Sequence, residues 1–208
     1  MKISAFEYHR PESIEEATGL LAELGDEAKI LAGGQSLLPL LALRLTKLPH
    51  LIDLGRVPGL DYVREESGQL TIGCMARHSA LELHPAAERS TPLVRMAMPH
   101  IGHRAIRNRG TVCGSLAHAD PAAELPAVMV ATGASMVASS GAGERVVAAE
   151  DFFTGYLSSA LSPEEILVEV RVPRAAQRSA WSLQEVTRRH GDFALIGLAA
   201  GLEIDEEG

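Results

Sequence analysis

Two stretches of glycines and other small residues constrain this chain more than any other feature. Residues 32–36 read Ala-Gly-Gly-Gln-Ser and lie between a short apolar run and the longer apolar run 37–45. Residues 110–115 read Gly-Thr-Val-Cys-Gly-Ser. Glycine lets a backbone turn sharply and approach another surface, and a strand–turn–helix order leaves N–H groups free where anions bind. With the hydroxyls of Thr111 and Ser115, such amides predict a diphosphate site.

This interpretation depends on the two stretches together. Taken alone, residues 109–126 are more typical of a turn followed by a capped helix. Neither stretch is Gly-x-Gly-x-x-Gly, and Gly-x-x-x-x-Gly-Lys-Ser/Thr does not occur, so the usual nicotinamide and nucleoside-triphosphate loops are absent. A helix dipole contributes only about 0.3–1 kcal/mol per nearby charge, so amide hydrogen bonds would do most of the holding.

Length, charge and cysteine content exclude several classes of protein. A chain of 208 residues is long enough for one domain of moderate size, or one plus a fragment. The formal net charge of −8 argues against nucleic-acid binding through a general basic surface. Cys74 and Cys113 are too few for a disulfide framework or a four-cysteine iron–sulfur cluster, and buried thiols are expected. No apolar run could span a bilayer and no signal-peptide core occurs, which predicts a cytoplasmic protein without a transmembrane segment.

The hydrophobic pattern predicts mixed α/β structure. Ser13 to Glu16 is typical of a capping box that starts a helix ending at Gly25. A strand at 29–31, a helix at 37–45 and a strand at 50–54 then form a β-α-β unit with parallel strands. Later strands are expected at 60–64, 69–73, 135–138, 145–148, 166–172, 181–186 and 193–204, and helices at 79–83, 92–101 and 122–131. Asp120 is expected to cap the last of these helices and to anchor the loop before it.

Other polar groups support weaker interpretations. His100 and His103 have a spacing seen in zinc sites, but no third ligand stands nearby, so solvated or capping histidines are favoured and no metal site is predicted. Arginines 104, 107 and 109 could attract a diphosphate, face a partner subunit or pair with carboxylates, and ion pairs are expected for at least two of them. No nucleophile elbow or cysteine–histidine pair is suggested by spacing, so no catalytic residue is predicted.

Residues 32–36, residues 107–115 and the Asp120-Pro121 pair together resemble the FAD-binding medium subunit of the molybdenum hydroxylases. These include the carbon monoxide dehydrogenase medium subunit and the flavin part of xanthine dehydrogenase. The resemblance runs from about Phe6 to the end of the chain. It implies the two-lobed FAD-binding α/β (α+β) fold of the vanillyl-alcohol-oxidase superfamily: a small β-α-β lobe over about 1–55, and a lobe with a mixed or antiparallel sheet over about 56–175.

The resemblance also implies the start of a C-terminal domain at 176–208. Family members continue into a complete domain there, so this segment is expected to have open strand edges. Apolar residues such as Trp181, Ile196 and Leu198 are expected to be unburied.

The residues that the resemblance places around non-covalently bound FAD fall into three groups. The diphosphate loops are Leu31, Ala32, Gly33, Gly34, Gln35, Ser36 and Leu37, with Thr111, Val112, Cys113, Gly114 and Ser115. Ile101, Asp120 and Glu124 match positions beside the flavin nucleotide, Ile101 near adenine and Glu124 near the ribose and adenine end. Leu167, Gln184, Asp192 and Phe193 match positions near the flavin ring. Cys113 stands where relatives often have glycine, Glu124 where they have aspartate, and Gln184 where they have lysine.

The function implied by the resemblance is electron transfer. Substrate would be oxidised at a molybdopterin-binding large subunit, and electrons would pass through an iron–sulfur small subunit to FAD on this chain and on to an acceptor. The expected assembly is therefore a hetero-oligomer. Two alternatives remain open: a flavin-free scaffold or assembly protein that kept the fold, and a self-sufficient flavin oxidase with its own substrate pocket.

Overall fold

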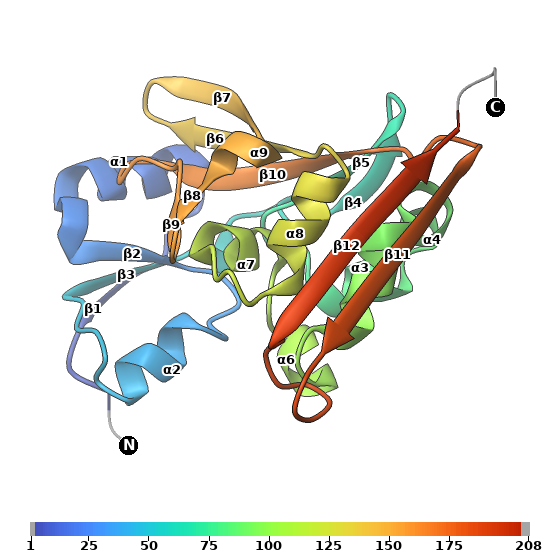
Figure 1. The fold of residues 1–208 in the computed structure, drawn as a ribbon. Helices are drawn as coiled ribbons and strands as arrows, with labels where there is room; N and C mark the ends of the chain where they lie inside the picture. Colours follow the sequence, from blue (N-terminus) through green and yellow to red (C-terminus); the bar gives the residue numbers. More distant parts are fainter. Residues whose placement is uncertain (1–2, 205–208) are drawn as a thin grey trace.

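The computed structural model describes residues 3–204, and its first lobe is built on a three-stranded parallel sheet. The strands β1 (Glu7–His9), β3 (His50–Asp53) and β2 (Ala28–Leu31) lie side by side in that order. Helix α2 (Leu37–Ala42) connects β2 to β3, so the predicted parallel β-α-β unit is confirmed. Strand β1, which the sequence pattern did not indicate, adds an edge to it (Figure 1).

Helix α1 (Ile14–Leu24) begins where the sequence predicts and packs on this lobe. The Ser13 hydroxyl accepts a hydrogen bond from the Glu16 amide at 3.1 Å, and Gly25 ends the helix with a positive φ of 55°. The Glu16 carboxylate accepts from the amide of Glu12 at 2.8 Å, one residue earlier than a standard capping box. Short 3₁₀ turns, η1 (Gly25–Glu27) and η2 (Leu54–Arg56), complete the lobe.

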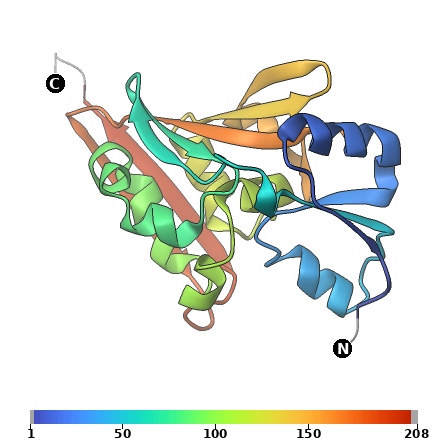
Figure 2. The same cartoon turned by 180° about the vertical axis from the view of Figure 1, so that it is seen from behind.

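The second lobe is organised around a five-stranded antiparallel sheet in the order β4-β5-β10-β6-β7. Its strands are β4 (Val63–Glu66), β5 (Gln69–Gly73), β10 (Ile166–Pro173), β6 (Ser135–Ser140) and β7 (Gly143–Ala148). Short helices gather on one side of it (Figures 1 and 2): α3 (His78–Leu83), α4 (Pro85–Ser90), α5 (Pro92–Ala97), η3 (Met98–His100), α6 (Arg104–Arg107), α7 (Val112–His118) and α8 (Glu124–Ala131). The remaining elements are α9 (Ala149–Phe152), β8 (Phe153–Gly155) and β9 (Ser158–Ser159). The two-lobed mixed fold is therefore as expected.

Several helix boundaries differ from those predicted. The helix expected over 37–45 ends at Ala42, and Arg44 has a φ of 57° that no right-handed helix contains. The helix expected over 92–101 stops at Ala97 and continues only as a 3₁₀ turn, because Pro99 lacks the N–H that an α-helix would use.

Two further corrections concern the segment around the second glycine stretch. The small residues of 112–118 form helix α7 itself, which the sequence interpretation missed, and the Thr111 hydroxyl caps it by accepting from the Gly114 amide at 3.2 Å. Asp120 does not cap α8, whose cap position is Ala123. Its carboxylate accepts from the Ala122 amide at 2.9 Å and holds the preceding turn, so the expected loop anchor is present and the expected helix cap is not.

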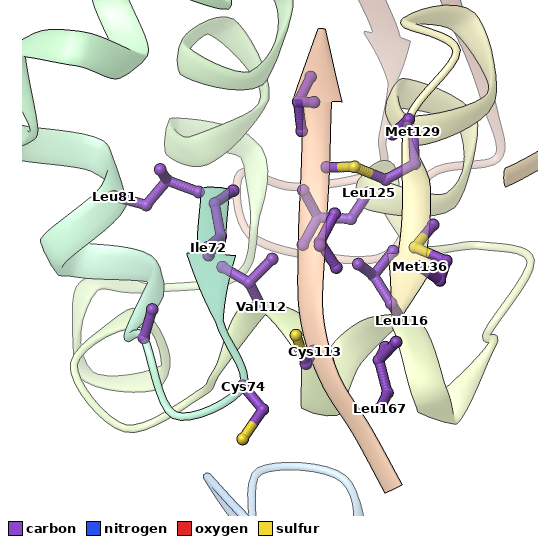
Figure 3. Packing of buried hydrophobic residues seen from close by; sticks show 14 of the residues in the cluster. Ile72, Cys74, Leu81, Val112, Cys113, Leu116, Leu125, Met129, Met136 and Leu167 are labelled. Carbon is purple, nitrogen blue, oxygen red and sulfur yellow. The ribbon is translucent and has the colours of Figure 1, made fainter. Parts of the chain in front are cut away.

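The hydrophobic core lies between the second sheet and its helices. Figure 3 shows Ile72 from β5, Met136 from β6 and residues of α7 and α8 pointing toward one another, and these side chains are fully buried. Cys74 and Cys113 belong to this core, so the prediction of buried thiols is confirmed. Burial raises the pKa of Cys74 to about 12 and that of Cys113 well above its ordinary value, so both thiols stay protonated.

The hairpin of β11 (Ser179–Val186) and β12 (Ile196–Glu203) lies against α5 and α8. Trp181, Leu183 and Ala199 pack against the core from its inner face, so the expectation that Trp181 is unburied is wrong. Ile196 and Leu198 are exposed, as expected. The acidic residues after Ile204 lie outside the described part of the chain. Within residues 3–204, no helix is both long and apolar enough to cross a bilayer.

Candidate functional site

The two glycine stretches meet backbone to backbone between the lobes. A β-carbon on Gly33 would lie 2.5 Å from the Arg109 carbonyl oxygen, 2.7 Å from the α-carbon of Gly110 and 2.9 Å from the Thr111 nitrogen. No side chain fits at that separation. The surface that Gly33 must approach is therefore the second glycine stretch, and the two segments form one structural unit, here called the paired loops (residues 32–36 and 109–115).

A cavity of about 800 Å³ lies beside the paired loops. Ile101 enters its wall from the turn after η3, Leu167 from β10, and Asp192 and Phe193 from the turn between β11 and β12. Ligand pockets typically have volumes of roughly 300–1,000 Å³. The cavity is therefore large enough for an extended cofactor that lies across both lobes.

Nearly all residues expected around the cofactor contribute to the wall of this one cavity. They are Leu31, Ala32, Gly33, Gly34, Gln35, Ser36 and Leu37 from the first lobe, and Ile101, Thr111, Cys113, Gly114, Ser115, Asp120, Glu124 and Leu167 from the second. Val112 does not line it, because its side chain is fully buried and its amide donates to the Ala76 carbonyl. Gln184 does not line it either: it is exposed on β11, beside a smaller depression that it shares with Glu124.

The paired loops carry backbone donors that the fold leaves free. Among the described residues, the amides of Gly33, Gly34, Gln35 and Ser36 donate to no backbone carbonyl, and neither does the amide of Cys113. The Gln35 side chain folds back and donates to the Gly33 carbonyl at 3.1 Å, which stiffens the first loop. Because α2 and α7 are short, these amides rather than helix dipoles would hold an anion.

Cys113 does not obstruct the loop. Its side chain is 2% exposed and lies in the core with Leu116 and Leu167 (Figure 3). At this position, where relatives often have glycine, the thiol therefore lies in the core and the backbone amide stays free to donate. The register of β10 with β6 shifts between Leu167 and Glu169 at the cavity wall, and such irregularities are common beside binding sites.

His78 is a feature of the site that sequence reasoning missed. It begins α3, lies at the cavity wall and is 4% exposed, yet neither ring nitrogen has a hydrogen-bond partner within the described chain. Burial, opposed by the backbone of Thr111 and aided by the positive charge of Arg107, lowers the pKa of His78 to about 4. An unpaired buried polar group is costly. The neutral ring at the cavity wall is therefore available to donate a hydrogen bond to a ligand or to accept one from it. No local motif marks this histidine.

Glu124 opens α8 at the cavity wall. Burial, together with smaller effects of the carboxylates of Glu185 and Asp120, raises the pKa of Glu124 to about 7. Its carboxyl group is thus partly protonated near neutral pH and can both donate and accept hydrogen bonds, as sugar hydroxyls require.

Of the three clustered arginines, Arg107 acts within the protein. Arg107 is buried, donates to Glu82 at 2.8 Å and to the carbonyls of Ile101 and Gly102 at 3.2 Å. Within residues 3–204 no ion pair forms at Arg104 or Arg109, so the expectation of at least two paired arginines is wrong. His100 pairs with Glu185 at 2.8 Å, and His103 contacts the edge of the His190 ring.

The geometry defines a class of protein that binds an extended cofactor between two lobes. The lobes meet at the paired loops, and a cavity lies beside these loops. Backbone amides without a hydrogen-bond acceptor within residues 3–204 and the unpaired ring of His78 lie at the cavity wall. These groups fit a dinucleotide, because amides and small residues suit its diphosphate while the apolar wall suits flat rings. Residues 4–175 match the family described as the FAD binding domain in molybdopterin dehydrogenase. The chain belongs to this family, and FAD is the cofactor that the family's domain binds.

Known proteins from bacterial dehydrogenase complexes are similar along almost the whole chain. The alpha subunit of the 6-hydroxypseudooxynicotine dehydrogenase complex of Paenarthrobacter nicotinovorans is 43% identical over 208 residues, which is 100% of this chain and 70% of that protein. Caffeine dehydrogenase subunit beta of Pseudomonas sp. (strain CBB1) is 45% identical over 96% of this chain and 68% of its own length.

The fold also matches a solved structure of a carbon monoxide dehydrogenase. The enzyme is that of Hydrogenophaga pseudoflava, in a form lacking the Mo-pyranopterin moiety of its cofactor. The match has a TM-score of 0.94 at 41% identity and covers 96% of this chain and 69% of that one. The chain is therefore a FAD-binding subunit of the molybdenum hydroxylase type of dehydrogenase, an oxidoreductase component.

Proposed function

We propose that this chain holds FAD with its diphosphate on the paired loops and passes electrons from a partner's iron–sulfur clusters through that FAD to an acceptor. The observation that carries the proposal is the backbone contact at Gly33, which brings two sets of unbonded amides to one cavity. FAD supplies the electron-transfer chemistry when bound. The relatives' names as dehydrogenase subunits support partners that hold molybdopterin and the iron–sulfur clusters.

The protein's own residues would bind and orient the cofactor. The amides of Gly33 to Ser36 and of Cys113 would donate to phosphate oxygens, and the Ser115 hydroxyl would add a further donor at the same wall. Glu124 would meet ribose hydroxyls toward the adenine end. Leu167, Asp192 and Phe193 would enclose the ring end, where apolar side chains exclude water.

A negative charge introduced at Ser36 tests whether the first of the paired loops binds the diphosphate of FAD. Ser36 occupies the N-cap position of α2 at the cavity wall, where Asp and Asn are both well tolerated. We expect Ser36→Asp to weaken FAD binding at least about tenfold, because a carboxylate would face the diphosphate, and Ser36→Asn to stay within about threefold. Flavin fluorescence titration at two salt concentrations measures both. Equal FAD affinities of the two variants would contradict the assignment of the diphosphate to residues 32–36.

The order of electron transfer is tested in the assembled complex. If FAD lies downstream of the iron–sulfur clusters, a complex stripped of flavin still reduces those clusters when substrate is added under anaerobic conditions, but no longer delivers electrons to an acceptor. Electron paramagnetic resonance of the clusters gives the first result and acceptor reduction the second. Loss of cluster reduction in the stripped complex would reverse the proposed order.

A further inference from the structure

We propose that Glu7, His9 and His50 form a binding site for a divalent transition-metal cation of the zinc type on the first lobe. All three residues lie outside the wall of the cavity beside the paired loops. The site is therefore separate from the proposed flavin site and requires nothing of it.

The parallel sheet places the three side chains together. Glu7 and His9 are separated by one residue on β1, so they point to the same face of the sheet. His50 begins β3 and is the Cα partner of Glu7 in the register of these strands. Since neighbouring strands lie only about 4.8 Å apart, all three side chains share one patch of this face.

Their donor atoms already have the spacing of metal ligands. His9 Nε2 lies 3.1 Å from His50 Nδ1, and His50 Nδ1 lies 3.3 Å from Glu7 Oε2. All three donor atoms fall within 4.8 Å of one another. Around a tetrahedral zinc ion with bonds of about 2.0–2.2 Å, two ligand atoms are roughly 3.3–3.5 Å apart. Small side-chain movements would therefore complete the site.

Hydrogen bonding alone does not satisfy the cluster. One nitrogen, His50 Nδ1, faces both Glu7 and His9, and a neutral ring nitrogen offers either one proton or one lone pair. If His50 Nδ1 accepts a hydrogen bond from His9, its lone pair also faces the negatively charged Glu7 carboxylate, which is unfavourable. If it donates to Glu7, the same proton must also serve His9. A cation between the three groups would accept all their lone pairs at once.

The donor set defines the kind of cation. Two imidazole nitrogens and one carboxylate oxygen suit zinc, copper or nickel better than calcium or magnesium, which take oxygen ligands. The Glu7 side chain is 74% exposed and that of His50 is 16% exposed. The site is therefore open to solvent at Glu7 and packed against the protein at His50. Water would fill the remaining coordination position, and the bound cation would tie β1 to β3.

The test uses the full chain without a histidine tag, stripped of metal with a chelator. We expect calorimetric titration with Zn²⁺ to show one saturable site per chain, and Co²⁺ to give the visible absorption of a tetrahedral complex. His50→Ala and His9→Gln should each raise the Kd for Zn²⁺ at least about tenfold. The matched control His190→Gln removes an exposed histidine elsewhere and should leave it unchanged. Zinc should raise the Tm of the unmodified chain but not of His9→Gln.

Absence of saturable binding overturns the proposal, and so does binding that survives both substitutions, because the cation would then lie elsewhere. His9→Gln keeps a polar side chain of similar size, and circular dichroism checks that it folds. FAD affinity is measured on the same variants and is expected to be unchanged.

Discussion

Glu124 shows how burial changes the chemistry of a single side chain. Its carboxyl group has an ordinary pKa of 4.5, which the fold raises to about 7, chiefly through burial. The folded state therefore favours the protonated form. The resulting penalty on stability is absent below the unfolded pKa, grows as pH rises through the interval between the two values, and is complete above about 7.

This ionisation predicts a pH-dependent effect of Glu124→Gln. In flavin-free protein the variant should have a higher Tm than the unmodified chain at about pH 8, and nearly the same Tm at about pH 3.5, where the Glu124 carboxyl is mostly protonated in both the folded and the unfolded state. Thermal unfolding followed by circular dichroism measures the difference. The exposed Glu144 on β7 offers the control Glu144→Gln, which should show no such dependence. A Tm difference that does not change with pH would contradict the assignment.

At the scale of elements, the paired loops hold the two lobes together, and Gly33 is the point of closest approach. Gly33→Ala should destabilise the protein by about 1–3 kcal/mol, because its methyl group would overlap the Arg109 carbonyl and force the loops apart. Urea unfolding followed by circular dichroism measures this.

The matched control is Gly19→Ala. Gly19 is exposed within α1, and an added methyl group there meets nothing within 4 Å, so the change should stabilise by about 0.5–1 kcal/mol. Similar effects of the two substitutions would show that the contact between the loops is dispensable.

Arg107 joins α6 to α3 and supports the turn that carries Ile101 to the cavity. Arg107→Ala would leave the Glu82 carboxylate and two carbonyl oxygens without their donor, and should cost about 3–5 kcal/mol. Arg89 pairs with Glu65 on the surface, with its side chain 62% exposed, so Arg89→Ala should cost only about 0.2–1 kcal/mol. Chemical denaturation compares the two, and equal losses would argue against the structural importance of the buried pair.

For the whole molecule, the two thiols report on opening of the core. Cys74 and Cys113 are each 2% exposed and hold their protons. Iodoacetamide should therefore label them only when the second lobe opens. We expect labelling to increase with urea in parallel with the loss of helical circular dichroism and with the change in fluorescence of Trp181, the single tryptophan, which lies on β11. Labelling that precedes both signals would show that the core opens locally.

The sequence by itself determined the features that short segments decide. The order of a short apolar run at 29–31, a glycine turn, an apolar run at 37–45 and a strand pattern at 50–54 predicted the parallel β-α-β unit, because turn and helix signals act over a few residues. The two glycine stretches likewise indicated a shared binding site, and most of the residues expected there line one cavity.

Only the tertiary structure decided what depends on residues distant in the chain. It brought the backbone of Gly33 against that of Arg109, left both ring nitrogens of His78 buried without a hydrogen-bond partner among the described residues and turned Gln184 to the outer surface. It also brought His50 beside Glu7 and His9, which are more than forty positions away. The spacing of residues within a short segment does not predict these contacts. Strand pairing and the packing of one lobe on the other create them, and both are properties of the folded chain as a whole.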